Sequence, residues 1–263
     1  MMDSQAAPGD ASAMARHLLL LGGTSEARAL AERLGGRGDL RVTLSLAGRT
    51  AKPAALPVPV RVGGFGGAEG LAEYLRAQRV DVLLDATHPY AARISANAHA
   101  AAQAAGVPLV ALRRPAWVPG PGDDWREVAD VAAACVALGT APRRVFLALG
   151  RQEVAGFAAA PQHRYLIRSV DAFAPPMPDC VCVTARGPFR LEDELALLAA
   201  HGIEAIVCKN SGGRASFAKL EAARAKRLPV LMLARPEPPP GPACATVEEA
   251  VAALDHALCP RGV

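Results

Sequence analysis

Candidate catalytic side chains gather in one short stretch, Asp85-Ala86-Thr87-His88-Pro89-Tyr90, which follows the apolar run 82–84. It brings a carboxylate, a hydroxyl, an imidazole and a phenol close together in the chain. An imidazole or a phenol held against a substrate can transfer a proton. The same residue types also cap helices and satisfy backbone groups, so a plain helix start is the alternative. Under the catalytic interpretation, His88 and Tyr90 are candidate proton donors, and Asp85 and Thr87 border the substrate.

The stretch Gly22-Gly23-Thr24-Ser25 has the composition of a turn that binds phosphate. It lies between the leucine run 18–21 and a helical pattern that begins near Glu26. Glycine lets the backbone turn sharply and approach a ligand, and the free N–H groups of a helix N-terminus attract an anion. The turn lacks the usual G-x-G-x-x-G spacing, and a tight turn with a hydroxyl cap explains it equally well. We expect Glu26 to be a first-turn helix residue and not a ligand.

The loop after the second apolar run bears on the choice of cofactor. NAD-binding folds carry an acidic residue there, roughly 20 residues after the glycines, to hold the ribose hydroxyls. This chain has Arg49 and Thr50 instead. An arginine suits the 2′-phosphate of NADPH, although a solvated loop arginine is the alternative. The next turn, Gly63-Gly64-Phe65-Gly66-Gly67, indicates a backbone close to a ligand or a flexible turn, and Gly64 is its candidate cofactor contact.

Cationic side chains follow apolar runs in the second half of the chain. They are Arg151, Arg186 and Lys209, and Lys209 opens the stretch Lys209-Asn210-Ser211-Gly212-Gly213. Side by side at one sheet edge, these cations would suit a ligand rich in carboxylates or phosphates. Isolated surface cations are the alternative.

Alternating strands and helices must position these residues, because short apolar runs alternate with helical patterns along the chain. This alternation predicts an α/β fold of mainly parallel sheets flanked by helices. Ligands of such sheets bind beyond the carboxyl ends of the strands. The predicted strands are 17–21, 41–46, 58–62, 80–85, 108–112, 144–149, 164–170, 180–184, 203–208 and 230–234. The predicted helices are 26–34, 68–79, 89–105, 128–138, 191–201, 215–227 and 247–258.

A segment rich in Pro and Gly, residues 113–125, divides the chain. We predict a disordered tail over 1–16 and two Rossmann-like domains over 17–117 and 118–263. The first would bind NADPH, and the active site would lie in the cleft between the two.

The composition argues against several classes of function. The chain has 263 residues, is 51% hydrophobic and carries a net charge of +4. Its arginines are scattered without interleaved aromatics, so we expect no nucleic-acid partner. No run approaches the roughly 18 apolar residues of a membrane span, so we expect no membrane partner and a cytoplasmic location.

Cysteine spacing and the lack of nucleophile motifs narrow the chemistry further. The six cysteines show neither C-x-x-C nor zinc-ligand spacing, which predicts buried free thiols and no metal. No nucleophile elbow or paired-carboxylate signature is present. A reductase fits this pattern, because its cofactor carries the chemistry.

The motifs LLLGGTSEAR, DATHPYAARISANA, GVPLVALRRPAW, RGPF and KNSGG, in this order, resemble the precorrin-6A reductase family of cobalamin (corrin ring) biosynthesis. The resemblance spans about residues 17–235. It implies two Rossmann-like domains that hold NADPH and a tetrapyrrole macrocycle between them, with hydride transfer giving precorrin-6B. The macrocycle carries acetate and propionate arms, which would explain cations at the site. Neighbouring enzymes of the corrin pathway are possible protein partners.

Carried onto this chain, the resemblance gives roles to the residues singled out above. Gly22 to Ser25 would hold phosphate and Arg49 the 2′-phosphate. The residues from Asp85 to Tyr90 would border the reaction centre. Lys209, Asn210, Ser211 and Gly212 would close the site from the second domain, with Gly212 on the cofactor side.

Several alternatives stay open at this point. The substrate could carry cobalt, since cobalt-precorrin-6A reductases are close relatives of the family. A non-catalytic NADP-sensing module would need the first-half glycines but no cationic site. An epimerase-like reductase would need a Y-x-x-x-K pair, and Tyr90 is followed by Ile94 at that position. A methyltransferase would need an acidic residue where Arg49 lies.

Overall fold

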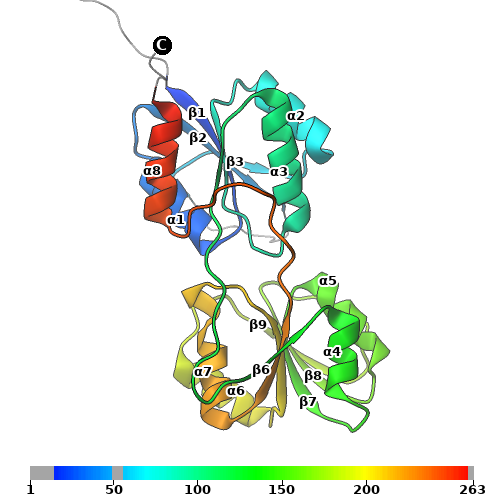
Figure 1. Ribbon diagram of the computed structural model, residues 1–263. Helices are drawn as coiled ribbons and strands as arrows, with labels where there is room; N and C mark the ends of the chain where they lie inside the picture. The colour runs from blue at the N-terminus through cyan, green and yellow to red at the C-terminus, as the bar shows by residue number, and fades with distance from the viewer. Residues whose placement is uncertain (1–14, 49–55, 260–263) are drawn as a thin grey trace, which may run out of the picture.

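The computed structural model describes residues 15–48 and 56–259, which form two α/β domains (Figure 1). The chain crosses between them twice, through the first linker (residues 112–123) and the second linker (residues 234–246). The first sheet has the strand order β3-β2-β1-β4-β5, and every neighbouring pair is parallel. The predicted fold class is confirmed for both domains. The strands of the first sheet are β1 (Arg16–Leu21), β2 (Leu40–Leu46), β3 (Val60–Val62), β4 (Val82–Asp85) and β5 (Leu109–Ala111).

The leucine run of β1 is buried on both faces of this sheet, which explains its unbroken apolar character. Leu18 and Leu20 pack with α1 (Ser25–Leu34) and α8 (Val247–Leu258) on one face. Leu19 and Leu21 pack with α2 (Gly67–Ala77) and α3 (Ala92–Ala105) on the other. Figure 1 shows the two helix pairs on opposite sides of the sheet.

The second sheet repeats this strand order. Its order is β6-β11-β10-β7-β8-β9, again with parallel neighbours. Read from β9 to β11, it matches the first sheet strand for strand, and β6 is added at the outer edge. The strand order reverses between β1 and β4 in the first sheet and between β7 and β10 in the second. Ligands of such folds bind at this point of reversal. The strands are β6 (Asp124–Val128), β7 (Arg144–Ala148), β8 (Arg164–Ser169), β9 (Cys180–Thr184), β10 (Ala205–Lys209) and β11 (Pro229–Leu233).

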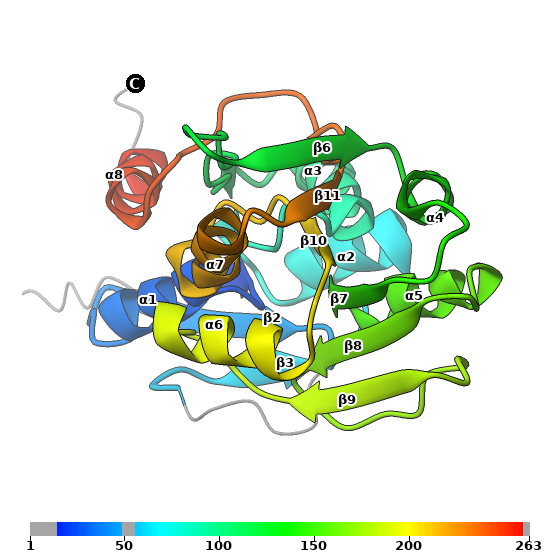
Figure 2. The same ribbon diagram turned by 90° about the horizontal axis from the view of Figure 1, so that it is seen from below.

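Helices again cover both faces of the second sheet (Figure 2). One face packs against α4 and the segment formed by α5 and η1, and the other packs against α6 and α7. The helices are α4 (Val131–Leu138), α5 (Arg151–Val154), η1 (Ala155–Ala159), α6 (Leu191–Ala200), η2 (Arg214–Ser216) and α7 (Ala218–Lys226). None of the described helices combines the length and the apolar character needed to cross a bilayer.

The predicted domain boundary at 118–263 is wrong for the end of the chain. Helix α8 packs its buried Ala250, Val251 and Leu254 into the core of the first domain. The chain returns there after β11, and Cys244 pairs with Leu112 in a parallel bridge. The α1 and α8 helices therefore cover one face of the first sheet together, although more than two hundred residues separate them in sequence.

Three local expectations also needed correction. Strand β6 begins inside the segment predicted as a linker, where its polar residues gave no strand signal. Helix α3 begins at Ala92 and not at Pro89, because Ala91 N donates to His88 O at 2.7 Å and closes a turn first. The thiols are not uniformly buried: Cys208 is buried, whereas Cys182 and Cys259 are exposed.

Candidate active site

The carboxyl ends of the two sheets face each other and are in contact. His88, in the loop after β4, has its Nε2 3.1 Å from Ser211 Oγ, in the loop after β10. Asn210 N donates to Tyr90 Oη at 2.9 Å, and Tyr90 Oη donates to Leu233 O at the end of β11. The stretch from Asp85 to Tyr90 thus meets the stretch from Lys209 to Gly212, as the motifs of both halves led us to expect.

The two glycines of the turn have different structural roles: Gly22 packs closely against β2, and Gly23 adopts a positive φ. A Cβ on Gly22 would lie 2.6 Å from Leu44 Cδ1, whereas Gly23 has φ +118° and open space around it. Thr24 is the N-cap of α1, since its Oγ1 accepts from Ala27 N at 3.1 Å, and it donates to Ala86 O at 2.8 Å. The Thr24 hydroxyl therefore ties the two loops of the first sheet together, and Ser25 Oγ donates to Glu26 Oε2 at 2.9 Å. With both hydroxyls engaged, the backbone N–H groups are the means to bind an anion there.

Asp85 lies beneath the site and does not face a ligand. Its side chain is 0% exposed, and Oδ1 accepts from Thr87 N at 3.0 Å and from Thr87 Oγ1 at 2.7 Å. Oδ2 pairs with Arg113 Nη2 at 2.7 Å. Thr87 Oγ1 also lies 3.2 Å from Ser95 Oγ. Both oxygens of the carboxylate are thus used to fix the loop and the start of the first linker.

His88 is neutral in this environment. Burial, followed by the positive charges of Arg114, Lys209 and Arg235, lowers the pKa of His88 to about 3. Tyr90 N donates to His88 Nδ1 at 3.2 Å, so the neutral ring carries its proton on Nε2. His88 Nε2 consequently donates to Ser211 Oγ, and the imidazole presents a neutral N–H at the junction.

Tyr90 holds its phenol proton firmly. Burial raises the pKa of Tyr90 to about 12. Its hydroxyl donates to one backbone group and accepts from another, and Lys209 Nζ lies 5.1 Å from the centre of its ring. The side chain therefore joins the loop before α3 to the ends of two strands of the other domain.

The three predicted cations are spread along the edge of the second sheet. Lys209 lies next to Tyr90 and pairs with Glu153 at 2.6 Å. Arg151 follows β7 and contacts Asp171 at 3.2 Å. Arg186 follows β9, the edge strand, and so lies on the far side of β8 from Lys209. Only Lys209 is thus placed directly at the His88–Tyr90 junction.

The other predicted cofactor residues have differing surroundings. Gly64 O accepts from Arg61 Nη2 at 2.6 Å in the turn after β3. Gly212 has φ +72°, and a Cβ there would lie 2.0 Å from Pro115 O, so the first linker occupies the space beside it. Arg49 and Thr50 lie outside the described residues.

Comparison with known proteins places this geometry in a family. The model of the precorrin-6x reductase family, CbiJ/CobK, matches residues 17–255. The chain belongs to that family. It is 51% identical over 254 residues to a precorrin-6A reductase of Sinorhizobium sp, covering 95% of this chain and 97% of the relative. A solved structure of CobK precorrin-6A reductase has 47% identity and a TM-score of 0.88, and covers 94% of this chain and 100% of that one. A cobalt-precorrin-6A reductase of Priestia megaterium is 28% identical over 90% of this chain and 97% of its own length.

Arginines of the two linkers also lie at the junction in this CbiJ/CobK family member, although the sequence motifs gave them no predicted role. Arg114 Nη1 pairs with Glu26 Oε2 at 2.7 Å, and Arg114 Nε donates to Ser211 O. Burial works to raise the pKa of Glu26, but the hydrogen bond and charge of Arg114 outweigh it and lower that pKa. Arg235 lies on the second linker and contacts the same loop. The pair Arg113-Arg114 inside GVPLVALRRPAW was the available signal.

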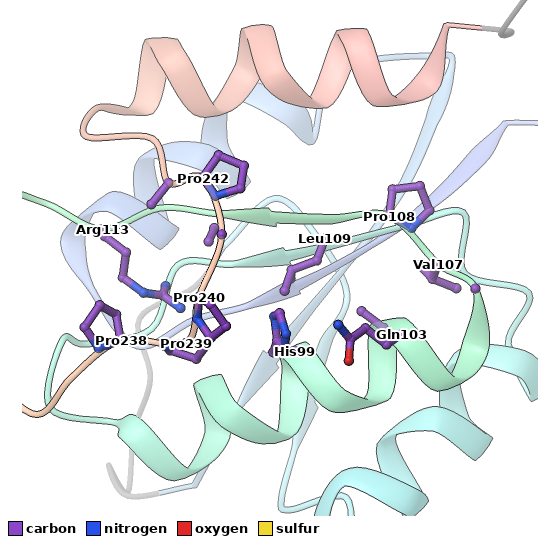
Figure 3. A pocket seen from close by; sticks show the side chains of 15 residues that line it. His99, Gln103, Val107, Pro108, Leu109, Arg113, Pro238, Pro239, Pro240 and Pro242 are labelled. Atoms are coloured by element: carbon purple, nitrogen blue, oxygen red, sulfur yellow. The ribbon is translucent and has the colours of Figure 1, made fainter.

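A cavity of about 510 Å³ lies on the flank of the first domain of this reductase-family protein. Figure 3 shows His99 and Gln103 of α3 beside Leu109 of β5, with Pro238 to Pro242 of the second linker opposite them. Apart from Arg113, which supports Asp85, its lining shares nothing with the junction described above. It lies beside β5 and not at the point where the strand order reverses.

Proposed function

We propose that this protein reduces precorrin-6A to precorrin-6B with NADPH as the hydride donor. The family relationship carries the proposal, because it extends over residues 17–255 and thus over both domains. The contact between the carboxyl ends of the two sheets supports it. A cofactor at the first sheet and a substrate at the second would meet at that junction.

The residues of the first domain fit a dinucleotide at the glycine turn. Gly23 combines a positive φ with open space, and α1 begins two residues later, at Ser25. Backbone N–H groups of Gly23 to Ser25 would hold the pyrophosphate at this helix N-terminus, whereas Gly22 N donates to Ser45 O at 3.0 Å and contributes only its lack of a side chain. Arg49, with Thr50 beside it, would bind the 2′-phosphate. When bound, NADPH supplies the hydride, and the chain supplies orientation and charge.

The residues of the second domain fit a macrocycle that carries carboxylate arms. Lys209 is a cation at the junction itself, and Arg151 and Arg186 extend the positive charge along the sheet edge. We assign these three side chains to the substrate's carboxylates, which they would orient through charge-assisted hydrogen bonds.

His88 acts in this proposal as a neutral imidazole that borders the macrocycle, with its N–H donated to Ser211 Oγ. Burial and the neighbouring cations lower the pKa of His88 to about 3, so the imidazole is neutral at neutral pH. The proton that accompanies the hydride is therefore assigned to solvent or to the macrocycle's own nitrogens and not to an imidazolium. Asp85 and Thr87 support His88 from beneath and do not touch the substrate.

The macrocycle proposed here is free of metal. The relatives named precorrin-6A reductase are 46% to 51% identical to this chain, whereas those named cobalt-precorrin-6A reductase are 27% to 28% identical. The decisive experiment is oxidation of NADPH followed by its absorbance, with precorrin-6A or cobalt-precorrin-6A supplied. We expect turnover of precorrin-6A. Absence of turnover where a known reductase is active would refute the proposal, and preference for the cobalt compound would refute its metal-free part.

The cofactor assignment makes a separate prediction for Arg49→Ala. Loss of a charged hydrogen bond to the 2′-phosphate should weaken NADPH binding by about 10- to 100-fold and leave NADH binding unchanged. Fluorescence titration of the reduced nucleotides measures both affinities. The matched control is Arg33→Ala. Arg33 lies at the C-terminal end of α1, away from the glycine turn, and forms an exposed ion pair with Glu248 of α8. Equal losses for the two nucleotides would remove Arg49 from the 2′-phosphate.

A further inference from the structure

The loop after β10 contacts both linkers that join the two domains. Asn210 Oδ1 accepts from Trp117 N at 2.8 Å, and Asn210 Nδ2 donates to Trp117 O at 2.9 Å. Asn210 O accepts from Arg235 Nε at 2.7 Å. Trp117 belongs to the first linker and Arg235 to the second, so one residue is bound to both connections.

The first domain is bound to the same loop. Asn210 N donates to Tyr90 Oη at 2.9 Å, so the backbone N–H of Asn210 bonds to the first domain while its carbonyl and side-chain amide bond to the linkers. Tyr90 Oη in turn donates to Leu233 O, the last residue of β11. The hydroxyl of Tyr90 therefore has its proton committed to one carbonyl and its acceptor site committed to Asn210.

The linkers are also bound to each other at this point. Arg235 Nη1 donates to Arg114 O at 3.0 Å, and Arg235 Nη2 donates to Pro115 O at 3.2 Å. Burial lowers the pKa of Arg235, and the guanidinium uses Nε and both terminal nitrogens on backbone carbonyls. The first linker packs directly against Gly212, since a Cβ added at this glycine would lie 2.0 Å from Pro115 O.

The second domain contacts the ring of Trp117 as well as its backbone. The Phe217 ring lies 5.6 Å from the Trp117 ring, and Lys219 Nζ lies 4.8 Å from its centre. Lys219 is itself buried and donates to Ser216 O. A buried cation over an aromatic ring adds to the attachment. The first linker is thus part of the second domain from Trp117 onward.

We propose that Tyr90, Asn210 and Arg235 are positioning residues, named here the inter-domain latch, which set the relative orientation of the two domains. The latch fixes the distance between the glycine turn of the first sheet and Lys209 of the second. In the reductase proposed above, that distance governs whether cofactor and substrate meet. Only this statement about activity rests on the proposed function. Tyr90 and Asn210 then act through the domains and do not contact the macrocycle.

The distance between the domains tests the latch without any substrate. Cys182 in the second domain and Cys259 after α8 in the first are exposed, and spin labels on them would report the domain separation. The half-buried Cys135, Cys180 and Cys244 would first be replaced by serine. We expect one narrow distance distribution in this background and a broader one in Asn210→Ala and in Tyr90→Phe. The parent distribution in both latch variants would overturn the inference.

Two substitutions provide matched controls for the distance measurement. Tyr165→Phe removes a 2.7 Å hydrogen bond to Ala160 O inside the second domain, so it has a comparable local cost without crossing the junction. Asn97→Ala removes the chain's other asparagine, on α3. Both should keep the narrow distribution. Broadening in the controls equal to that in the latch variants would also overturn the inference.

Activity separates a positioning residue from a proton donor. We expect Tyr90→Phe and Asn210→Ala to lower kcat for precorrin-6A by up to about 100-fold, since misplacement by about 1 Å can cost that much. Affinity for NADPH should hold, because the glycine turn lies within one domain. The pH profile of Tyr90→Phe should keep its shape. If the pH profile of Tyr90→Phe loses one of its two slopes while the distance between the spin labels is unchanged, Tyr90 is the proton donor and the inference is overturned. If the parent itself does not reduce precorrin-6A, the proposed function fails while the distances still decide the latch.

Discussion

Replacing Asp85 by alanine should lower the free energy of unfolding by about 3–5 kcal/mol, the cost of leaving one partner of a buried ion pair alone. Asp85 is fully buried and Arg113 is only 17% exposed, at 2.7 Å from it. The substitution also removes the acceptor for Thr87 N and Thr87 Oγ1. Urea unfolding at neutral pH measures the change.

An exposed ion pair of the same domain is the control for Asp85→Ala. Glu248 pairs with Arg33 at 3.6 Å and is 74% exposed, so Glu248→Ala should cost less than about 1 kcal/mol. If Asp85 were a substrate ligand and not a buried support, its loss would reduce activity and leave stability near that of the control. A small stability change for Asp85→Ala would therefore contradict the structural role assigned to this carboxylate.

The positions of the strands could be predicted because burial on both faces imposes long apolar runs. The run 18–21 predicts β1, and the periodicity of Ala27, Leu30, Ala31 and Leu34 predicts α1, whose four apolar residues are all buried. Strand β6 escaped prediction because it is an edge strand with mostly polar residues, and its pairing with β11 is what makes it a strand. Helix α8 was predicted as a helix but assigned to the wrong domain, since no local pattern specifies which sheet a terminal helix will cover.

The strand ends predicted which loops of the two sheets meet at the junction, but the partners of their side chains were not foreseen. A polar residue after a strand looks the same in sequence whether it faces a ligand or bonds to the backbone. Asp85 was expected at the substrate and is bonded to Arg113, on the linker. Asn210 was expected there too and is bonded to Trp117. Contacts such as that between His88 and Ser211 join residues 123 positions apart, and only the arrangement of the two domains creates them.

The repeated strand order explains why these contacts converge. Each sheet has a point where the order reverses, between β1 and β4 in one and between β7 and β10 in the other. The loops at both points come from the carboxyl ends of parallel strands, so each domain presents its binding edge there. Because the two edges face each other, the cofactor site and the substrate site proposed above would lie within one junction. The linkers must then enter that junction, which is why Arg114 and Arg235 became part of it.

Acid should destabilise the protein through His88. The pKa of His88 is about 3 in the folded protein and 6.5 as the ordinary value, so between these values the unfolded chain binds a proton that the folded one does not. Stability is then complete above pH 6.5 and falls as the pH drops toward 3, by about 1.4 kcal/mol per pH unit within the window. From pH 7 to pH 5 we expect a loss of about 2 kcal/mol from this residue.

The variant His88→Gln isolates this contribution from other acid-sensitive groups. His17 and His163 also have pKa values lowered by burial, so the parent will lose stability in acid through more than one histidine. Glutamine can donate to Ser211 but does not titrate, so the loss between pH 7 and pH 5 should shrink by about 2 kcal/mol in His88→Gln. His256→Gln, on the exposed face of α8, should follow the parent. Urea unfolding at the two pH values measures all three proteins, and parallel losses in His88→Gln and the parent would show that His88 is not held neutral by its surroundings.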